Sequence, residues 1–161
     1  MMAMIFALLY SSLAFSDTAK ITVKVAMFPG GSFEVTSNEV VGSGLKKGDK
    51  YSAAELKVPV KSLVTGIDLR DTHMRERLRE KEFPFITAKN IDAKDGTGTA
   101  TITIAGVTQK LDFKFKNADN QTAEATFKIK LSDFKISEIS YLGVGIEDEI
   151  EVIANVGYQP G

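Results

Sequence analysis

The sequence predicts an all-β protein, a closed antiparallel barrel of about eight strands with one short helical segment between two of them. Apolar and polar residues alternate along many short segments, as in Thr99–Ile104, a pattern typical of strands because successive side chains point to opposite faces. Turn-forming pairs such as Asp95-Gly96 separate these segments and indicate hairpins. The alternation stops in Ile67–Phe85, which holds every arginine of the chain and predicts the helical segment.

The predicted strands follow one another along most of the chain. They cover residues 21–27, 32–36 with 39–45, 51–60, 85–92, 99–104, 111–115, 123–131 and 150–156. Gly42 and Gly44 suggest a bend or bulge within 39–45, and residues 138–147 are expected to form a loop. Each later strand is apolar on one face and charged on the other. A closed barrel satisfies this pattern and leaves no open edge, but a two-sheet sandwich would show the same alternation.

The helical segment is expected to lie at one end of the barrel. Asp68 is the predicted N-cap, and the arginines that follow favour helix. Met74 and Leu78 are four residues apart and therefore share a face. Pro84 is expected to end the segment.

Length and composition exclude several classes of protein. A chain of 161 residues with 43% hydrophobic residues suits a single folded domain. The net charge of −1 gives no overall field that would attract nucleic acid. Without cysteine there are no disulfides, no thiolate catalysis and no cysteine zinc site.

The first 16 residues predict a secretory signal peptide. They contain no charged side chain, and they are too few to span a bilayer, which takes roughly 20 residues. Small residues at Ala14 and Ser16 suit signal peptidase. We therefore expect residues 17–161 to form one domain without an integral membrane segment. Export of a chain that lacks cysteine favours the bacterial periplasm, or secretion.

The sequence does not predict an enzyme. His73 is the only histidine, so a metal site is not expected. It lies two residues from Asp71, and residues two apart on a helix do not face each other. No serine stands in a G-x-S-x-G context, and no dinucleotide fingerprint is present. We expect no catalytic residue, no metal and no cofactor.

Inward-facing phenylalanines and isoleucines are the main candidates for a binding site. In a barrel of about eight strands these side chains either fill the interior or line a cavity for one ligand, and the pattern leaves both outcomes open. The candidates for the lining are Ile102, Ile104, Phe113, Phe115, Phe127 and Ile129.

An ordered set of short motifs resembles the YceI-like family. The matching segments are Val64-Thr65-Gly66, Leu69-Arg70-Asp71 with His73-Met74-Arg75, Glu82-Phe83-Pro84 with Thr87, Thr101–Lys110, Ser132-Asp133-Phe134 and Asp148–Val152. They run in the family's order and cover nearly the whole predicted domain. Lys135 stands where the family carries a glycine.

The resemblance implies a lipocalin-like barrel in a periplasmic or secreted protein that binds a long-chain amphiphilic lipid, such as a polyisoprenoid or an isoprenoid quinone. Storage or transport of that lipid would need no covalent chemistry. Arg70 and Arg75 are candidates for a head-group site because arginine binds phosphate through two parallel hydrogen bonds. The alternative for the arginines is a solvated helix face on which they pair with acidic residues. The alternative for the whole protein is a filled barrel that serves the envelope as a stress or protein-interaction module. The oligomeric state stays open, a homodimer included.

Overall fold

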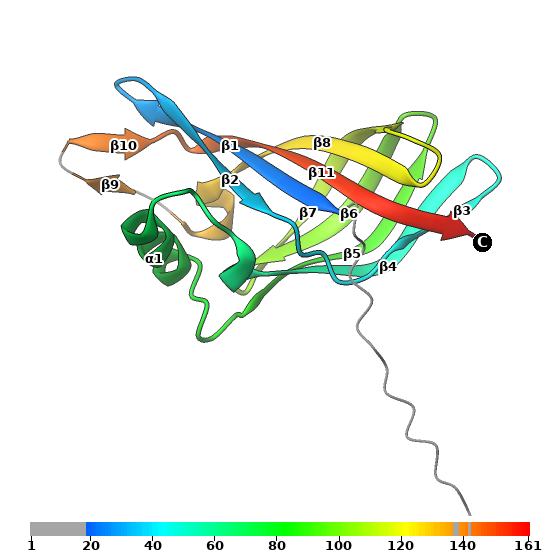
Figure 1. Cartoon of the computed structure of the whole chain (residues 1–161), viewed down its shortest axis with the longest axis horizontal. Helices are drawn as coiled ribbons and strands as arrows, with labels where there is room; N and C mark the ends of the chain where they lie inside the picture. Colours follow the sequence, from blue (N-terminus) through cyan, green and yellow to red (C-terminus); the bar gives the residue numbers. More distant parts are fainter. Residues whose placement is uncertain (1–18, 137–138, 142) are drawn as a thin grey trace, which may run out of the picture.

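The computed structural model describes residues 19–136, 139–141 and 143–161. These residues contain eleven β-strands, one α-helix and two 3-10 helices. The predicted signal peptide lies outside these residues. The elements are β1 (Lys20–Phe28), β2 (Ser32–Ser37), β3 (Gly44–Lys47), β4 (Lys50–Pro59), η1 (Val60–Ser62), α1 (Asp68–Arg77), β5 (Phe85–Lys94), β6 (Thr97–Ile104), β7 (Val107–Asn117), β8 (Thr122–Lys130), η2 (Leu131–Phe134), β9 (Ser140–Tyr141), β10 (Val144–Ile146) and β11 (Glu149–Pro160) (Figure 1).

The strands confirm the predicted all-β barrel, but its closed ring has seven strands rather than eight. The ring runs β3-β4-β5-β6-β7-β8-β11 and returns to β3. The closing pair is parallel, with Tyr158 opposite Gly44 and Pro160 opposite Lys46, so the barrel is not antiparallel throughout. β11 spans 12 residues and extends well past the predicted end at residue 156. The residues beyond that point, Tyr158 to Pro160, are the ones that pair with β3.

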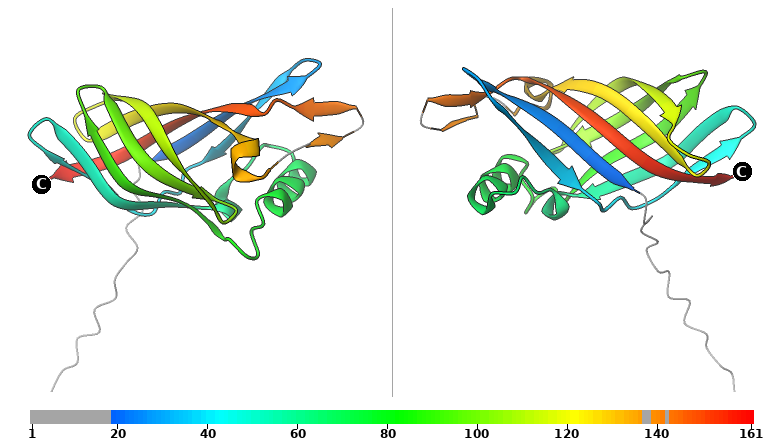
Figure 2. Two further views of the ribbon diagram at one scale, coloured as in Figure 1. Left: turned by 180° about the vertical axis from the view of Figure 1, so that it is seen from behind. Right: turned by 45° about the horizontal axis from the view of Figure 1, so that its top comes forward.

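Two further strands widen the wall towards the end of the barrel near α1. β1 pairs with β11 on one side and with β2 on the other, and the three strands run side by side in both Figure 1 and Figure 2. Two isolated bridges, Thr36 to Val64 and Val41 to Lys57, connect the β2 side to β4 and the segment after it. The barrel wall is therefore continuous around β2, although no full ladder forms there.

The predicted hairpin at Asp95-Gly96 is confirmed. Both residues have positive φ, 55° and 82°, as a two-residue type I′ turn requires. The next turn is centred on Ala105 and Gly106, with φ of 49° and 79°, so Val107 already belongs to β7. Lys135, which replaces the family's glycine, has a φ of 59°, a conformation that glycine adopts without steric cost.

The predicted loop over residues 138–147 was wrong where the structure describes it, at residues 139–141 and 143–147, because β9 and β10 pair there. β10 pairs with the end of β1, with Met27 opposite Ile146. Gly143 has a φ of 78°, which suits a tight turn. This hairpin and the β1–β2 hairpin extend beyond the barrel at the same end as α1 (Figures 1 and 2).

The helical segment lies at one end of the barrel, as predicted, but its boundaries differ. Ile67 is the N-cap and Asp68 is the first helical residue, so the predicted Asp68 cap was wrong. The carboxylate of Asp68 still lies in the first turn, where negative charge complements the helix dipole. The helix ends at Arg77, and Arg79 leaves the helical conformation with a φ of 55°, well before Pro84.

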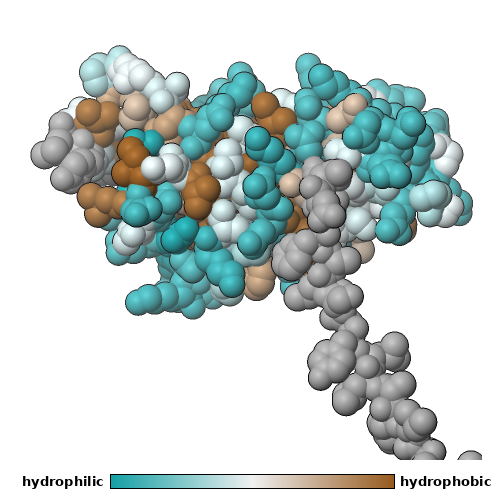
Figure 3. All heavy atoms as spheres, viewed as in Figure 1, coloured by the Kyte–Doolittle hydropathy of each residue, from teal (hydrophilic) through white to brown (hydrophobic). Residues whose placement is uncertain are grey.

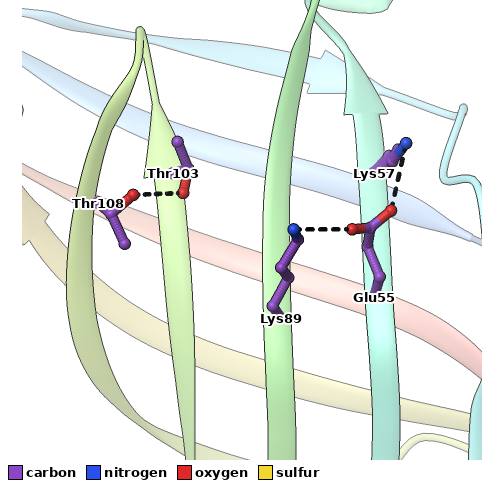
Figure 4. Close-up of polar contacts among 5 residues, drawn as sticks. All are labelled: Glu55, Lys57, Lys89, Thr103 and Thr108. Atoms are coloured by element: carbon purple, nitrogen blue, oxygen red, sulfur yellow. Dashed lines mark hydrogen bonds and ion pairs between the residues drawn. The ribbon is translucent and has the colours of Figure 1, made fainter.

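The outer face of the barrel is polar, as the alternation predicted (Figure 3). Glu55 on β4 lies 3.2 Å from the ammonium of Lys57 and 3.4 Å from that of Lys89 on β5. Across β6 and β7 the hydroxyls of Thr103 and Thr108 are hydrogen-bonded at 2.8 Å (Figure 4). These polar pairs lie on the outer face, and the apolar residues that alternate with them along each strand face inward.

Gly98 gives the ring of Phe113 its place on the inner face. The two residues are opposite each other in the β6–β7 ladder. A Cβ at position 98 would lie 2.7 Å from the carbonyl oxygen of Asp92 and would collide with the Phe113 ring.

Gly98→Ala should therefore lower the free energy of unfolding by about 1–3 kcal/mol through overpacking, measured by urea denaturation. Gly30→Ala is the control, since nothing lies within 4 Å of its added Cβ, and equal stability of the two variants would contradict the proposed close contact.

Candidate ligand cavity

The inward-facing side chains do not meet across the barrel. They enclose a cavity of about 930 Å³, which is near the upper end of the usual range for ligand sites, roughly 300–1,000 Å³. Every ring strand contributes to its lining, together with β1, β2, β9, β10 and α1. The lining is mostly apolar, with few charged side chains. The barrel is therefore not filled by its own side chains.

All six residues predicted for the lining face this cavity: Ile102, Ile104, Phe113, Phe115, Phe127 and Ile129. Ile102, Ile104 and Phe113 are buried. Phe127 and Ile129 point inward but are only half-buried, because one side of each faces the open space of the cavity. Whether these residues contact a ligand stays a prediction.

Small inward-facing residues are what the sequence reasoning overlooked. Ala93 and Ala100 are buried against Phe113, and Ala125 and Ala154 face each other across β8 and β11. All four line the cavity. An inner face that carried leucine or phenylalanine at these positions would fill the space, so alanine at inward positions of the alternation was the available signal for a cavity.

The cavity opens at the end where α1 lies. Ile67, Leu69 and Val144 line the cavity and are also 50%, 58% and 42% exposed, so the apolar lining continues out to the surface there. Phe28, on the adjacent β1–β2 hairpin, is 65% exposed. In Figure 3 hydrophobic side chains gather at this end of the molecule. The structure thus places the mouth of the cavity between α1 and the β9–β10 hairpin.

Charged side chains reach the cavity only at this mouth, among the described residues. Arg70, His73, Glu76 and Arg77 of α1 are part of the lining. The guanidinium of Arg70 lies 4.2 Å from the ring centre of Phe33, an arrangement in which a cation stacks on an aromatic face. Arg70 is therefore positioned to meet a polar group at the mouth.

Arg75, the other predicted head-group residue, is not part of the lining. Its Nη2 donates hydrogen bonds to the carbonyl oxygens of Lys61 and Leu63, at 2.9 Å and 3.2 Å. These bonds tie α1 to the segment that follows β4. Just after the helix, Arg79 forms an ion pair with Glu82.

Asp71 anchors the start of α1. It is buried, and its Oδ1 accepts hydrogen bonds from the backbone N–H of Thr65 at 2.7 Å and from the Thr65 hydroxyl at 2.6 Å. Burial acts to raise the pKa of Asp71, but the two Thr65 hydrogen bonds, with Arg75 and Arg70 nearby, outweigh it and lower the pKa. The helix at the mouth is therefore held by a charged carboxylate.

Within the described ranges, no three His, Asp or Glu side chains gather in a way that would hold a metal ion. Nor does any helix in that part of the chain have the length and apolar character needed to cross a membrane. His73 lies on α1 at the mouth, away from any such cluster.

A closed β-barrel around a long apolar cavity defines a class of small-molecule and lipid-binding proteins. The chain belongs to the YceI-like domain family, because the model of that family matches residues 11–158. This confirms the resemblance inferred from the motifs. No curated protein matches the sequence.

Solved structures share the fold at low sequence identity. BcnA of Burkholderia cenocepacia is 16% identical, with a TM-score of 0.69, over 88% of this chain and 96% of that protein. A polyisoprenoid-binding domain from Saccharophagus degradans, implicated in plant cell wall breakdown, is 13% identical, with a TM-score of 0.64, over 86% and 92%. The Campylobacter jejuni YceI protein is 22% identical, with a TM-score of 0.56, over 76% and 82%. At these identities the likeness establishes the fold.

Asp71→Asn should loosen α1 from the barrel. Loss of the charged acceptor should cost about 1–3 kcal/mol of stability at pH 7. The folded-state pKa of Asp71 lies below its usual value, so the contribution is present above about pH 4 and is lost as the pH falls through the folded-state pKa. The wild type and the variant should therefore converge in acid, as measured by urea denaturation and by hydrogen exchange of the α1 amides. Asp68→Asn, which changes an exposed carboxylate in the same turn, is the control and should have a smaller effect. A difference that persists unchanged in acid would contradict this role.

Proposed function

We propose that the protein binds a long-chain amphiphilic lipid, a polyisoprenoid or an isoprenoid quinone, and stores or carries it without covalent chemistry. The observation that carries the proposal is the apolar cavity of about 930 Å³, whose charged lining residues all lie at the end beside α1. Membership of the YceI-like family and the fold shared with a polyisoprenoid-binding domain support it.

The chemistry of the lining suits a hydrocarbon tail. Burial of each methylene contributes about 0.8 kcal/mol, so roughly ten buried carbons supply about 8 kcal/mol before the entropic cost of association. The branched and aromatic side chains around the cavity offer such a tail contact on all sides. The few polar groups along the walls make binding depend on shape and apolar contact.

The mouth suits the polar end of the lipid. With the tail inside the barrel, the head group lies beside α1, where Arg70 and Arg77 reach the cavity. A phosphate or pyrophosphate would accept hydrogen bonds from a guanidinium, whereas a quinone would place a carbonyl there. In this proposal Arg75 acts indirectly, because its hydrogen bonds to Lys61 and Leu63 hold α1 in place.

The proposed setting is the bacterial periplasm, reached through the predicted signal peptide at residues 1–16. A lipid that passes between membranes must cross water there, and a barrel that encloses the tail removes that barrier. The alternative of a filled barrel used as an interaction module loses its premise, because the cavity is too large for a filled core.

Narrowing the cavity at Ala125, opposite Phe115 in the β7–β8 ladder, should weaken lipid binding. Ala125 faces inward on β8 and lines the cavity, so Ala125→Phe places a ring in the path of the tail. After delipidation and refolding, the wild type should take up an added polyprenyl lipid in native mass spectrometry, and Ala125→Phe should bind it at least about tenfold more weakly, a loss of about 1.4 kcal/mol.

Lys128→Phe on the same strand is the matched control, because Lys128 is exposed on the outer face and the cavity does not change. Equal lipid binding by Ala125→Phe and the wild type, with both proteins folded by circular dichroism, would place the lipid elsewhere. A wild type that takes up no polyprenyl lipid or quinone would refute the proposed function.

A further inference from the structure

The end of the cavity opposite α1 is formed by three aromatic rings. Tyr51 lies near the start of β4, Phe115 near the end of β7 and Tyr158 near the end of β11, and all three line the cavity. The ring centres of Tyr51 and Phe115 are 5.0 Å apart with planes at 64°, and those of Tyr51 and Tyr158 are 5.1 Å apart with planes at 86°. Rings in such edge contact leave no passage for a carbon chain between them.

Polar contacts on the outer side hold these rings in place. The hydroxyl of Tyr51 donates to Oδ1 of Asn117 at 2.9 Å. The ammonium of Lys46 lies 5.4 Å from the ring centre of Tyr51 and 5.9 Å from that of Tyr158, within the range of a cation–π contact. The backbone N–H of Tyr158 donates to the carbonyl of Gln121 at 2.9 Å. The group is therefore restrained by several elements at once.

The barrel closure brings the rings together. Tyr158 is opposite Gly44 in the parallel β3–β11 pair, and a Cβ on Gly44 would lie 3.4 Å from the Cβ of Tyr158. Beyond the rings, the hairpin tips at residues 47–50 and 117–121, all of which the structure describes, contribute nothing to the lining.

The two ends of the cavity therefore differ. The α1 end is bordered by exposed apolar residues and carries Arg70, and the opposite end carries the contacting rings of Tyr51, Phe115 and Tyr158. Along β11 the lining runs from Ile150 to Tyr158, a rise of roughly 26 Å at 3.3 Å per residue. A tail that enters beside α1 reaches the rings after a fixed distance.

We propose that Tyr51, Phe115 and Tyr158 form an end wall that determines the longest isoprenoid tail the cavity encloses. The inference rests on the proposed lipid binding. Each isoprene unit that fits before the wall adds apolar contact and tightens binding. Units beyond that length remain in water at the mouth and add nothing.

The test is a series of polyprenyl phosphates with increasing numbers of isoprene units, bound to the delipidated, refolded full-length protein and measured by native mass spectrometry in competition. For the wild type, affinity should rise with each added unit and then level off at one length. In the double variant Tyr51→Ala with Tyr158→Ala, that limit should move to tails longer by one unit or more.

Two controls separate the wall from other effects. Tyr51→Phe keeps the ring but loses the hydroxyl that binds Asn117, so the limit should stay where it is in the wild type. Leu45→Ala removes an exposed apolar side chain at the same end, outside the lining, and should also leave the limit unchanged. A shift of the limit in Leu45→Ala equal to that in the double variant would overturn the assignment of the wall.

A second variant keeps the proposal testable if the double variant does not fold. Ala123 lines the cavity close to the wall, since it is opposite Asn117 in the β7–β8 ladder. Ala123→Phe should thicken the wall and move the limit to shorter tails. Unchanged limits in the folded wall variants, with lipid still bound, would refute the end wall and leave the proposed function intact. Failure of the wild type to bind any member of the series would instead refute the proposed function.

Discussion

The structure depends on β11, the strand that closes the barrel. One edge of β11 is hydrogen-bonded to β8 over nine residue pairs, and the other edge is shared between β1 and β3. Closure fixes the side-chain alternation of every ring strand, so that one face must be enclosed. Because several enclosed positions are alanine, the enclosed face surrounds a space instead of a packed core. The same closure brings Tyr158 next to Tyr51, although these two residues are far apart in the sequence.

The two ends of this enclosed space have opposite chemistry. At the mouth, charged and exposed apolar side chains lie together on α1, and the helix is held by Asp71 and Arg75 through hydrogen bonds to the connector after β4. At the far end, rings contact one another and Lys46 lies over two of them. An amphiphile has the same asymmetry, with one polar and one apolar end. In the proposed function, this arrangement gives the bound lipid one orientation, with its head group beside Arg70.

Local signals predicted the fold class, the hairpin at Asp95-Gly96 and the six lining residues, because strand alternation and turn chemistry are properties of short segments. The parallel pairing of β3 with β11 is a contact between distant segments, and alternation carries no information about it. The same holds for Arg75, whose direction is set by the carbonyls of Lys61 and Leu63, and for the meeting of Tyr51 and Tyr158. The short strands β9 and β10 were overlooked because Gly143 and Gly145 resemble a loop in sequence.

The central claim is that the apolar interior encloses a lipid tail in the living cell. It is tested most directly by purifying the protein from its native host, extracting it with organic solvent and identifying the released molecules by mass spectrometry. The account predicts one long-chain isoprenoid per barrel, enriched over the same lipid recovered from an unrelated protein purified alongside. Repeated recovery of the intact protein without any enriched lipid would contradict it.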